Sequence, residues 1–233
     1  MFSIVLLSLV ATMVTGVPVE ELKSADYDHY VFTQVYPAGS CYSCFLQGKG
    51  YECNFPSNAS TWTIHGLWPS EGTTKHPVFC NNETMFDPDA IMSLVPKLVA
   101  KWTNVFNHTG FFHFWKDEYQ KHGTCSGLSE YEYFSKVLKL FDQLPPLGNV
   151  FQNAGVVPDN KRGYAVDKLR SVLTAQFGVS PALQCAHVKG GVQILDQIEL
   201  CLSMDWKPMV CPGSTDSCSG DDVHYPQYSP SGY

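Results

Sequence analysis

The 233-residue sequence predicts a single α+β domain: a central antiparallel sheet flanked by helices and held by disulfide bridges. Helical patterns cluster in the middle of the chain while strand-like runs lie toward both ends, an order typical of α+β domains rather than βαβ repeats. Nine cysteines indicate bridges formed in an oxidising compartment. Hydrophobic residues make up 44% and charged residues 16%, which excludes a disordered tail or a coiled coil.

The N-terminus has the pattern of a secretory signal. Residues 4–14 form an apolar run too short to span a bilayer, and Val14-Thr15-Gly16 fits a signal-peptidase site. No Lys or Arg precedes the run, so a strand of the mature fold is the alternative. We expect a signal peptide over residues 1–16, a mature domain over 17–233, no membrane span, and secretion or delivery to lysosomes or endosomes.

Three runs of residues have strand character. Residues 28–36 and 61–67 are rich in aromatic and β-branched side chains, and Pro69 is expected to end the second run. Residues 193–204 alternate between apolar and polar side chains. These runs supply the predicted sheet.

Helix signals fill the middle of the chain. Asp87-Pro88 fits an N-cap followed by Pro at the first helical position, and Pro96 is expected to kink or shorten that helix. Ser129 and Glu132 fit a capping box that opens a second helix, which Pro145-Pro146 ends.

A third helix is predicted over residues 166–173, with Gly178 after its end. The segment after Pro212 is rich in Gly, Ser, Pro and Asp, so we expect it to be irregular and tethered by a bridge.

The net charge limits the possible partners. A formal charge of −7 excludes a strongly basic nucleic-acid binder at neutral pH. Protonation of all eight histidines would change this charge to +1, so a polyanion would meet a different surface in an acidic compartment.

Three sequons predict N-glycosylation. They begin at Asn58, Asn82 and Asn107, and none has Pro in the middle position. Behind a signal peptide they support one another, and they predict that the three loops face solvent.

Two segments contain the candidate catalytic residues. In Trp62-Thr63-Ile64-His65-Gly66-Leu67-Trp68-Pro69, an imidazole lies near an indole at the end of a strand. In residues 114–125, Glu118 and His122 are four apart and share a helix face, as do Asp117 and Lys121. A structural histidine and a solvated helix face with ordinary ion pairs are the alternatives for the two segments taken separately.

Together the two segments resemble the active-site signatures of the ribonuclease T2 family of secreted acid endoribonucleases. The resemblance begins at Gln34-Val35-Tyr36-Pro37, passes through both segments, and continues through Gln197-Ile198-Glu199-Leu200-Cys201 to Cys218. It implies an α+β fold and metal-free cleavage of single-stranded RNA. In that reaction the ribose 2′-OH attacks the adjacent phosphorus and expels the 5′ oxygen. A 2′,3′-cyclic phosphate forms, and its hydrolysis is a separate second step.

The resemblance also implies residue roles. His65 and His122 match the two essential histidines, with His122 assigned as the base and His65 as the acid. Glu118 matches the catalytic glutamate, and Lys121 offers positive charge to the phosphate. Trp68 is either a stacking platform for a base or a structural residue. RNA is the expected substrate, with no DNA, no cofactor and no metal, and we expect a monomer.

Asp117 departs from the family pattern because a second histidine is usual there. An inward Asp117 would repel the phosphate by roughly 4 kcal/mol at 4 Å and an effective dielectric of 20. Tyr119 also replaces the usual Trp. We expect an active enzyme of reduced rate.

The family pattern implies four bridges and leaves Cys44 unpaired, with Cys44–Cys53 as the alternative to the first bridge. The implied pairs are Cys41–Cys53, Cys80–Cys125, Cys185–Cys218 and Cys201–Cys211.

Two other functions compete with the enzyme. A catalytically silent relative would bind RNA, glycans or a receptor, and Asp117 motivates this hypothesis. A zinc hydrolase is disfavoured because the histidines lack the H-E-x-x-H spacing and the thiols are expected to be oxidised.

Overall fold

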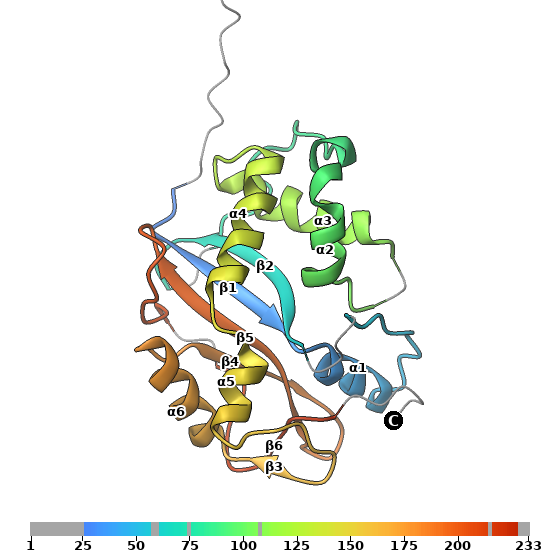
Figure 1. The fold of residues 1–233 in the computed structure, drawn as a ribbon, viewed down its shortest axis with the longest axis vertical. Helices are drawn as coiled ribbons and strands as arrows, with labels where there is room; N and C mark the ends of the chain where they lie inside the picture. Colours follow the sequence, from blue (N-terminus) through green and yellow to red (C-terminus); the bar gives the residue numbers. More distant parts are fainter. Residues whose placement is uncertain (1–25, 57–60, 74–75, 107–108, 214–215, 228–233) are drawn as a thin grey trace, which may run out of the picture.

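The computed structural model describes residues 26–56, 61–73, 76–106, 109–213 and 216–227. Its sheet has six strands in the order β2-β1-β5-β6-β3, with β4 also paired to β5 (Figure 1). The pairs are antiparallel except for the short β5–β6 pair, which is parallel. The strands are β1 (His29–Val35), β2 (Thr63–Ser70), β3 (Gly163–Tyr164), β4 (Ala182–His187), β5 (Gln193–Ser203) and β6 (Val223–His224).

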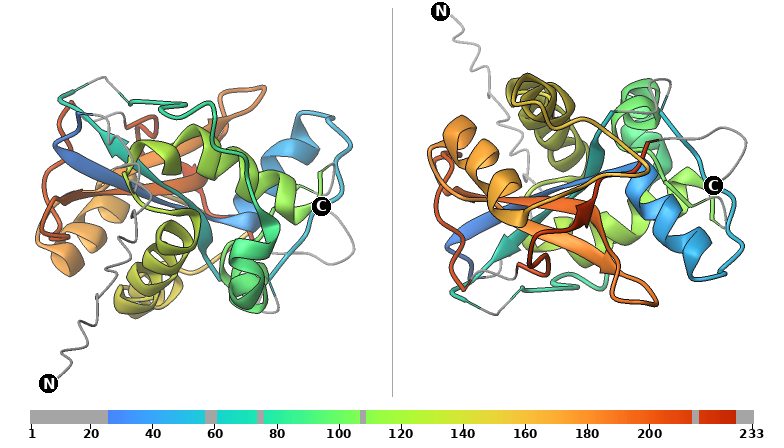
Figure 2. Two further views of the ribbon diagram at one scale, coloured as in Figure 1. Left: turned by 90° about the horizontal axis from the view of Figure 1, so that it is seen from above. Right: turned by 90° about the horizontal axis from the view of Figure 1, so that it is seen from below.

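Helices flank this sheet, so the predicted α+β class is confirmed. The two views of Figure 2 place α4 and α6 on the same side of the sheet. The helices are α1 (Pro37–Leu46), the 3₁₀ helix η1 (Pro88–Leu94), α2 (Val95–Lys101), α3 (Phe111–Lys121), the 3₁₀ helix η2 (Gly123–Cys125), α4 (Glu130–Gln143), α5 (Leu147–Asn153) and α6 (Val166–Phe177).

The core on the helical side of the sheet follows the two-residue period of the strands. Phe32 of β1 and Leu200 of β5 are opposite each other and are buried in one cluster with Trp115 of α3 and Phe134 of α4. A second cluster packs α5 and α6 against the other end of the sheet around Trp62. Both clusters are dense in aromatic side chains, which bury large areas and hold the helices in fixed positions.

The predicted caps form as the local sequence dictates. Ser129 Oγ accepts from the backbone N–H of Glu132, whose carboxylate accepts from the backbone N–H of Ser129. Gly178 ends α6 with a φ of 74°, a left-handed conformation that glycine adopts without steric cost. Asp87 caps η1 through the backbone N–H of Asp89, at 3.0 Å.

The helix predicted after Asp87 differs in detail. It starts as the 3₁₀ helix η1 and continues as α2, and Pro96 lies in the first turn of α2. Proline is tolerated there because the first helical N–H groups have no partner within the helix.

The prediction that Pro69 ends its strand is wrong. Strand β2 continues to Ser70, and Pro69 lies opposite Tyr30. In the described sheet, β2 is an edge strand that pairs with β1 alone. Proline has no N–H to donate to a neighbouring strand. On an edge strand this position can face the open side, where no strand needs the hydrogen bond, so the strand can continue through the proline.

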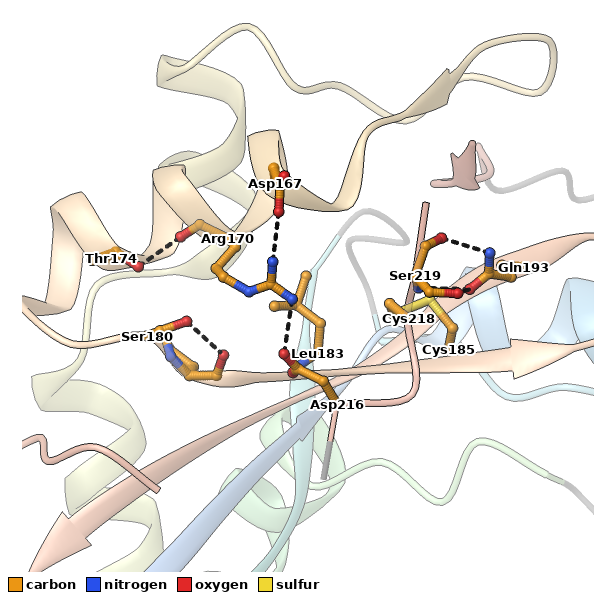
Figure 3. A network of polar contacts seen from close by, with 11 residues as sticks. Asp167, Arg170, Thr174, Ser180, Leu183, Cys185, Gln193, Asp216, Cys218 and Ser219 are labelled. Atoms are coloured by element: carbon orange, nitrogen blue, oxygen red, sulfur yellow. Dashed lines mark hydrogen bonds and ion pairs between the residues drawn. A yellow bond between two sulfur atoms is a disulfide. The ribbon is translucent and has the colours of Figure 1, made fainter. Parts of the chain in front are cut away.

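The C-terminal segment is tethered as expected but is not wholly irregular. Strand β6 pairs with β5 and β3. Arg170 of α6 reaches Asp216, whose carboxylate accepts from the backbone N–H of Leu183 (Figure 3). The Cys185–Cys218 bridge and a bond from the backbone N–H of Ser219 to Gln193 add two more ties.

Elements α1, α5 and β4 were not predicted from the sequence. Among the described residues, no helix has the length and apolar character needed to cross a membrane. In the same ranges, no cluster of three or more His, Cys, Asp or Glu side chains is arranged to hold a metal ion.

Candidate active site

A β-bulge turns His65 toward the site. Ile64 pairs with Gln34 and Gly66 with Thr33, which leaves His65 as the extra residue of β2. The backbone carbonyl of His65 accepts from Trp102 Nε1 at 2.7 Å, and this bond holds the bulge. A bulge shifts the alternation of side chains by one residue.

The shift allows residues three apart to face the same side. Ile64 and Leu67 both enter the core, while His65 and Trp68 both remain half-buried on the site side. The rings of His65 and Trp68 lie 5.2 Å apart in an edge-on arrangement.

Helix α3 supplies the other half of the site. Glu118 lies one turn before the end of α3, and His122 is the C-cap residue, with its backbone N–H bonded to Glu118 O at 3.0 Å. The chain leaves the helix through Gly123, where an added Cβ would collide with the ring of Tyr119. Because Tyr119 is buried in the core, the absence of a side chain at Gly123 lets the chain turn past this ring directly after His122.

Glu118 connects the two halves. Its Oε2 accepts from Trp68 Nε1 at 3.0 Å, and its Oε1 lies 3.5 Å from His65 Nε2. The ring of Trp68 also lies 5.2 Å from the ring of His122. The indole of Trp68 thus lies between the two histidines and orients the carboxylate.

Gly66 makes room for this contact. A Cβ at this position would collide with Glu118 Oε2 and with Trp68 Nε1. The absence of a side chain at Gly66 therefore lets the carboxylate and the indole meet beside the strand.

Burial changes the charge states in the site. Burial raises the pKa of Glu118, while the charge of His65 and the hydrogen bond from Trp68 oppose that change. Burial also lowers the pKa of His122 to about 3, and the positive charges of Lys121, His65 and His76 act in the same direction.

The two histidines differ in their partners. The His122 side chain has a buried Nδ1 with no hydrogen-bond partner among the described residues. In contrast, His65 has acceptors at both ring nitrogens, because its Nδ1 lies 2.5 Å from Gln197 Oε1 and its Nε2 faces Glu118.

A cavity of about 320 Å³ opens beside His65. Its apolar wall includes Val35, Phe106 and Phe114, and polar groups of Asn104 and Gln197 line it as well. The ring of Phe114 stacks on the ring of His65 at a centroid distance of 6.0 Å. No local pattern in the sequence indicates this cavity. Its wall comes from segments that are far apart in the chain: α1, α3, β1, β5 and the segment after α2.

The comparisons with known proteins agree with the geometry. A family model for the Ribonuclease T2 family matches residues 27–218. The chain belongs to the ribonuclease T2 family. Membership makes it an endoribonuclease of the T2 type, and it confirms the resemblance seen in the two sequence segments.

Several characterised ribonucleases are similar to the chain. Ribonuclease T2 of Sus scrofa is 37% identical over 71% of this chain and 84% of its own length. The crystal structure of human RNase T2 has a TM-score of 0.71 at 30% identity and covers 86% of this chain and 98% of its own. The structure of RNase NT in complex with 5′-AMP has a TM-score of 0.76 at 27% identity, covering 88% of this chain and 100% of its own.

Asp117, where the resemblance implies a second histidine, points away from the other candidate residues of this ribonuclease T2 relative. Asp117 is 58% exposed at its side chain, and its Oδ2 lies 3.3 Å from His113 Nε2 one helical turn earlier. Asp117 therefore points outward and pairs with His113, whereas its spacing in the sequence had placed it on a shared helix face with Lys121. Lys121 is itself exposed, and its charge lowers the pKa of both Glu118 and His122.

The disulfide bridges join the four pairs implied by the family pattern, Cys41–Cys53, Cys80–Cys125, Cys185–Cys218 and Cys201–Cys211. Cys44 is free and buried. The Cys80–Cys125 bridge anchors the loop after β2 to the segment just past His122, so it ties together the two halves of the site.

Of the predicted glycosylation sites, Asn82 is exposed, and Asn58 and Asn107 lie outside the described residues. The expected signal peptide, residues 1–16, also lies outside them.

Proposed function

We propose that the chain cleaves single-stranded RNA by metal-free transesterification and leaves 2′,3′-cyclic phosphate ends. One observation carries the proposal: two histidines from different elements flank the Trp68 ring at 5.2 Å each, with the Glu118 carboxylate beside them. A base for the 2′-OH and an acid for the leaving oxygen are the two proton-transfer groups that this reaction requires.

His122 suits the role of the base. Its burial holds the imidazole neutral over the pH range in which RNA is stable to handling, since its pKa lies at about 3. A proton on its buried Nδ1 would lack a partner in the described structure, which also favours the neutral ring.

His65 suits the role of the acid. An acid must hold an extra proton before the reaction, and the imidazolium of His65 would find an acceptor at each nitrogen, Gln197 Oε1 and Glu118 Oε1. Its side chain is 31% exposed, so the 5′ leaving oxygen of a substrate can reach it.

Lys121 acts on the phosphate, and Glu118 acts on His65. The positive charge of Lys121 offsets the negative charge that develops on the phosphorane. Glu118 stabilises the protonated form of His65, and Trp68 orients Glu118. The engaged indole nitrogen favours this positioning role for Trp68 over a stacking role, and the cavity beside His65, with Phe114 in its wall, is the better place for a base.

The N-terminal signal and the three sequons support secretion or transfer to an acidic compartment, with glycans at Asn58, Asn82 and Asn107. Protonation of histidines in such a compartment weakens the repulsion between a negatively charged protein and RNA. The protein acts as a monomer on RNA and requires no cofactor.

An RNA digestion between pH 4 and 8 tests the proposal. The purified protein should convert a short RNA to products with cyclic phosphate ends, identified by mass spectrometry, and the rate should peak below pH 7. His65→Phe and His122→Phe should both abolish this conversion. EDTA should leave the rate unchanged, and loss of cleavage on chelation would contradict the metal-free mechanism.

The same assay addresses the silent-relative hypothesis, which Asp117 motivated. The outward position of Asp117 removes the main argument for that hypothesis, since the anion pairs with His113 instead of facing the phosphate. Wild-type protein that binds the RNA but leaves it intact at every pH would support the silent relative.

A further inference from the structure

We infer that Gln197 and Asp196 are positioning residues that fix the tautomer of His65, so that Nδ1 holds a permanent proton and Nε2 faces the cleft. The inference rests on the proposed role of His65 as the acid. It assigns a purpose to two neighbouring residues of β5 that neither form part of the two signature segments nor touch the other proposed catalytic groups.

Two β-bulges bring these residues together. His65 is the extra residue in the β1–β2 pairing, and Asp196 is the extra residue in the β4–β5 pairing. Gln197 follows Asp196 on β5 and lies opposite Val35 of β1, the strand that separates β5 from β2. A bulge changes the direction in which a side chain points. The two bulges therefore allow the side chains of His65, Gln197 and Asp196 to meet in one hydrogen-bonded chain.

The polar chain has a defined direction. Gln197 Nε2 donates to Asp196 Oδ2 at 3.3 Å, and Ser40 Oγ donates to Asp196 Oδ1. A carboxylate only accepts, so it holds the amide nitrogen of Gln197 on its side. The amide oxygen then faces His65 Nδ1 at 2.5 Å, and since this oxygen has no proton, Nδ1 must donate.

The fixed tautomer has a chemical consequence. Nε2 is left as the nitrogen that gains and loses the catalytic proton, and it lies 3.5 Å from Glu118 Oε1 at the cleft. Without an acceptor at Nδ1, the neutral ring can hold its proton on either nitrogen and can turn away from this orientation. Gln197 therefore keeps Nε2 bare in the neutral ring and directed at the cleft, where it takes up the proton that the acid later donates.

Asp196 is suited to hold Gln197. Burial raises the pKa of the Asp196 carboxyl, while the bonds from Ser40 and Gln197 and the charge of His65 oppose this change. The backbone carbonyl of Asp196 also accepts from the N–H of Tyr36 at 2.7 Å, so the bulge is fixed on both the main-chain and the side-chain side.

Several charged or titratable groups surround His65, so a test must separate their effects on the pH–rate profile. Glu118 and His122 face His65 from α3 and its C-cap, Asp196 faces it from β5, and Lys49 lines the same cavity from the segment after α1. The variants below leave all four of these charged or titratable side chains in place.

Nitrogen NMR on the ¹⁵N-histidine-labelled protein tests the tautomer directly. At a pH where His65 is neutral, the wild type should show a protonated Nδ1 and a bare Nε2. In Gln197→Leu the signals should change to a mixture of both forms or to Nε2–H. A wild-type ring that is protonated at Nε2 instead would overturn the inference, whatever the activity of the protein.

The pH–rate profile gives a second readout. Gln197→Leu should lower kcat by about 10- to 100-fold and move the alkaline limb of the profile to lower pH by about one unit. Gln197→Glu places a negative charge at Nδ1 and should move the same limb to higher pH. A mere loss of packing would not move the alkaline limb in opposite directions in the two variants. Equal losses of rate with no movement of the limb in either variant would contradict the positioning role.

Gln193→Leu is the matched control. Gln193 is on the same strand, but its side chain bonds to Ser219 at the start of β5 (Figure 3). Its pH profile and the His65 signals should match those of the wild type. Two results together would separate this inference from the proposed function. If His65→Phe retains full activity while NMR of the wild type shows Nδ1–H, the proposed catalytic role of His65 fails and the tautomer assignment stands.

Discussion

The two candidate histidines occupy opposite kinds of environment. His65 lies on a bulged edge strand, is partly exposed, and has an acceptor at each ring nitrogen. His122 lies at the end of a helix, is 6% exposed, and has an unpartnered Nδ1 among the described residues. The same side chain is thus partnered at both ring nitrogens in one place and buried with an unpartnered nitrogen in the other.

The proposed acid and the proposed base therefore differ in solvation and in hydrogen-bond partners. An acceptor at each nitrogen stabilises an imidazolium, whereas burial without partners stabilises a neutral imidazole. The direction assigned from family resemblance, with His122 as the base and His65 as the acid, therefore has a physical basis in the two environments.

Removing either histidine should have the largest effect on rate. His65→Phe and His122→Phe each delete one proton-transfer group, which is expected to lower single-turnover cleavage of a short RNA by about 10²- to 10⁴-fold. His187→Phe is the control, because this exposed ring bonds only to the backbone of Ser217 in the described structure. A variant of either site histidine that cleaves within a few-fold of the wild-type rate would refute its assigned role.

The buried histidine should also make the protein sensitive to acid. The pKa of His122 is about 3 in the folded state, below the value near 6.5 of an unfolded chain, so the unfolded state binds the extra proton first. This contribution to stability is present above pH 6.5 and is lost as the pH falls toward 3, at about 1.4 kcal/mol per pH unit.

Urea unfolding at pH 7, 5.5 and 4 measures this loss. The free energy of unfolding of the wild type should fall more steeply with acid than that of His122→Phe, since other titrating groups are common to both proteins. Parallel curves would show that His122 titrates normally and would remove the contrast with His65.

Glu118→Gln should trade activity for stability. Burial raises the pKa of Glu118, so the ionised carboxylate costs stability above the unfolded value near 4.5. The neutral amide can still accept from Trp68, and we expect about 1 kcal/mol of added stability at pH 7, vanishing in acid, together with slower cleavage. Thermal unfolding and the cleavage assay check both signs, and a less stable variant at pH 7 would show that the ionised carboxylate is needed for folding.

The sequence contains much of this fold because its signals are local. The capping box at Ser129, the glycine at Gly178 and the alternation over residues 193–204 depend on neighbours in the chain, and each appears in the structure as predicted. Pro69 misled the prediction because its effect depends on whether the strand is at an edge, which is a property of the whole sheet.

In the candidate site too, contacts set by local spacing could be predicted, whereas contacts between distant segments could not. Glu118 and His122 share a helix face by their spacing, and motif resemblance paired them with His65. The sequence places Gln197 in a strand and in a stretch that resembles the family but not beside His65, because that contact arises from a bulge and from pairing between distant strands. The partner of Asp117 was also missed, since His113 is one of two possible neighbours a turn away and the sequence does not show which one the side chain chooses.

Substitution of Asp117 should have the smallest effect, although the family resemblance implies a histidine at this position. An exposed pair such as Asp117–His113 contributes about 0–1 kcal/mol, so Asp117→Asn should change single-turnover cleavage by less than about fivefold. Asp117→His should stay within the same range and gain most in acid, where the new imidazole is charged. A rise of more than tenfold in Asp117→His would mean that this position faces the phosphate during the reaction, and an inert wild type with an active Asp117→His variant would favour the silent relative. A wild type slowed by both substitutions would instead give the Asp117–His113 pair a positive role at the open end of the site.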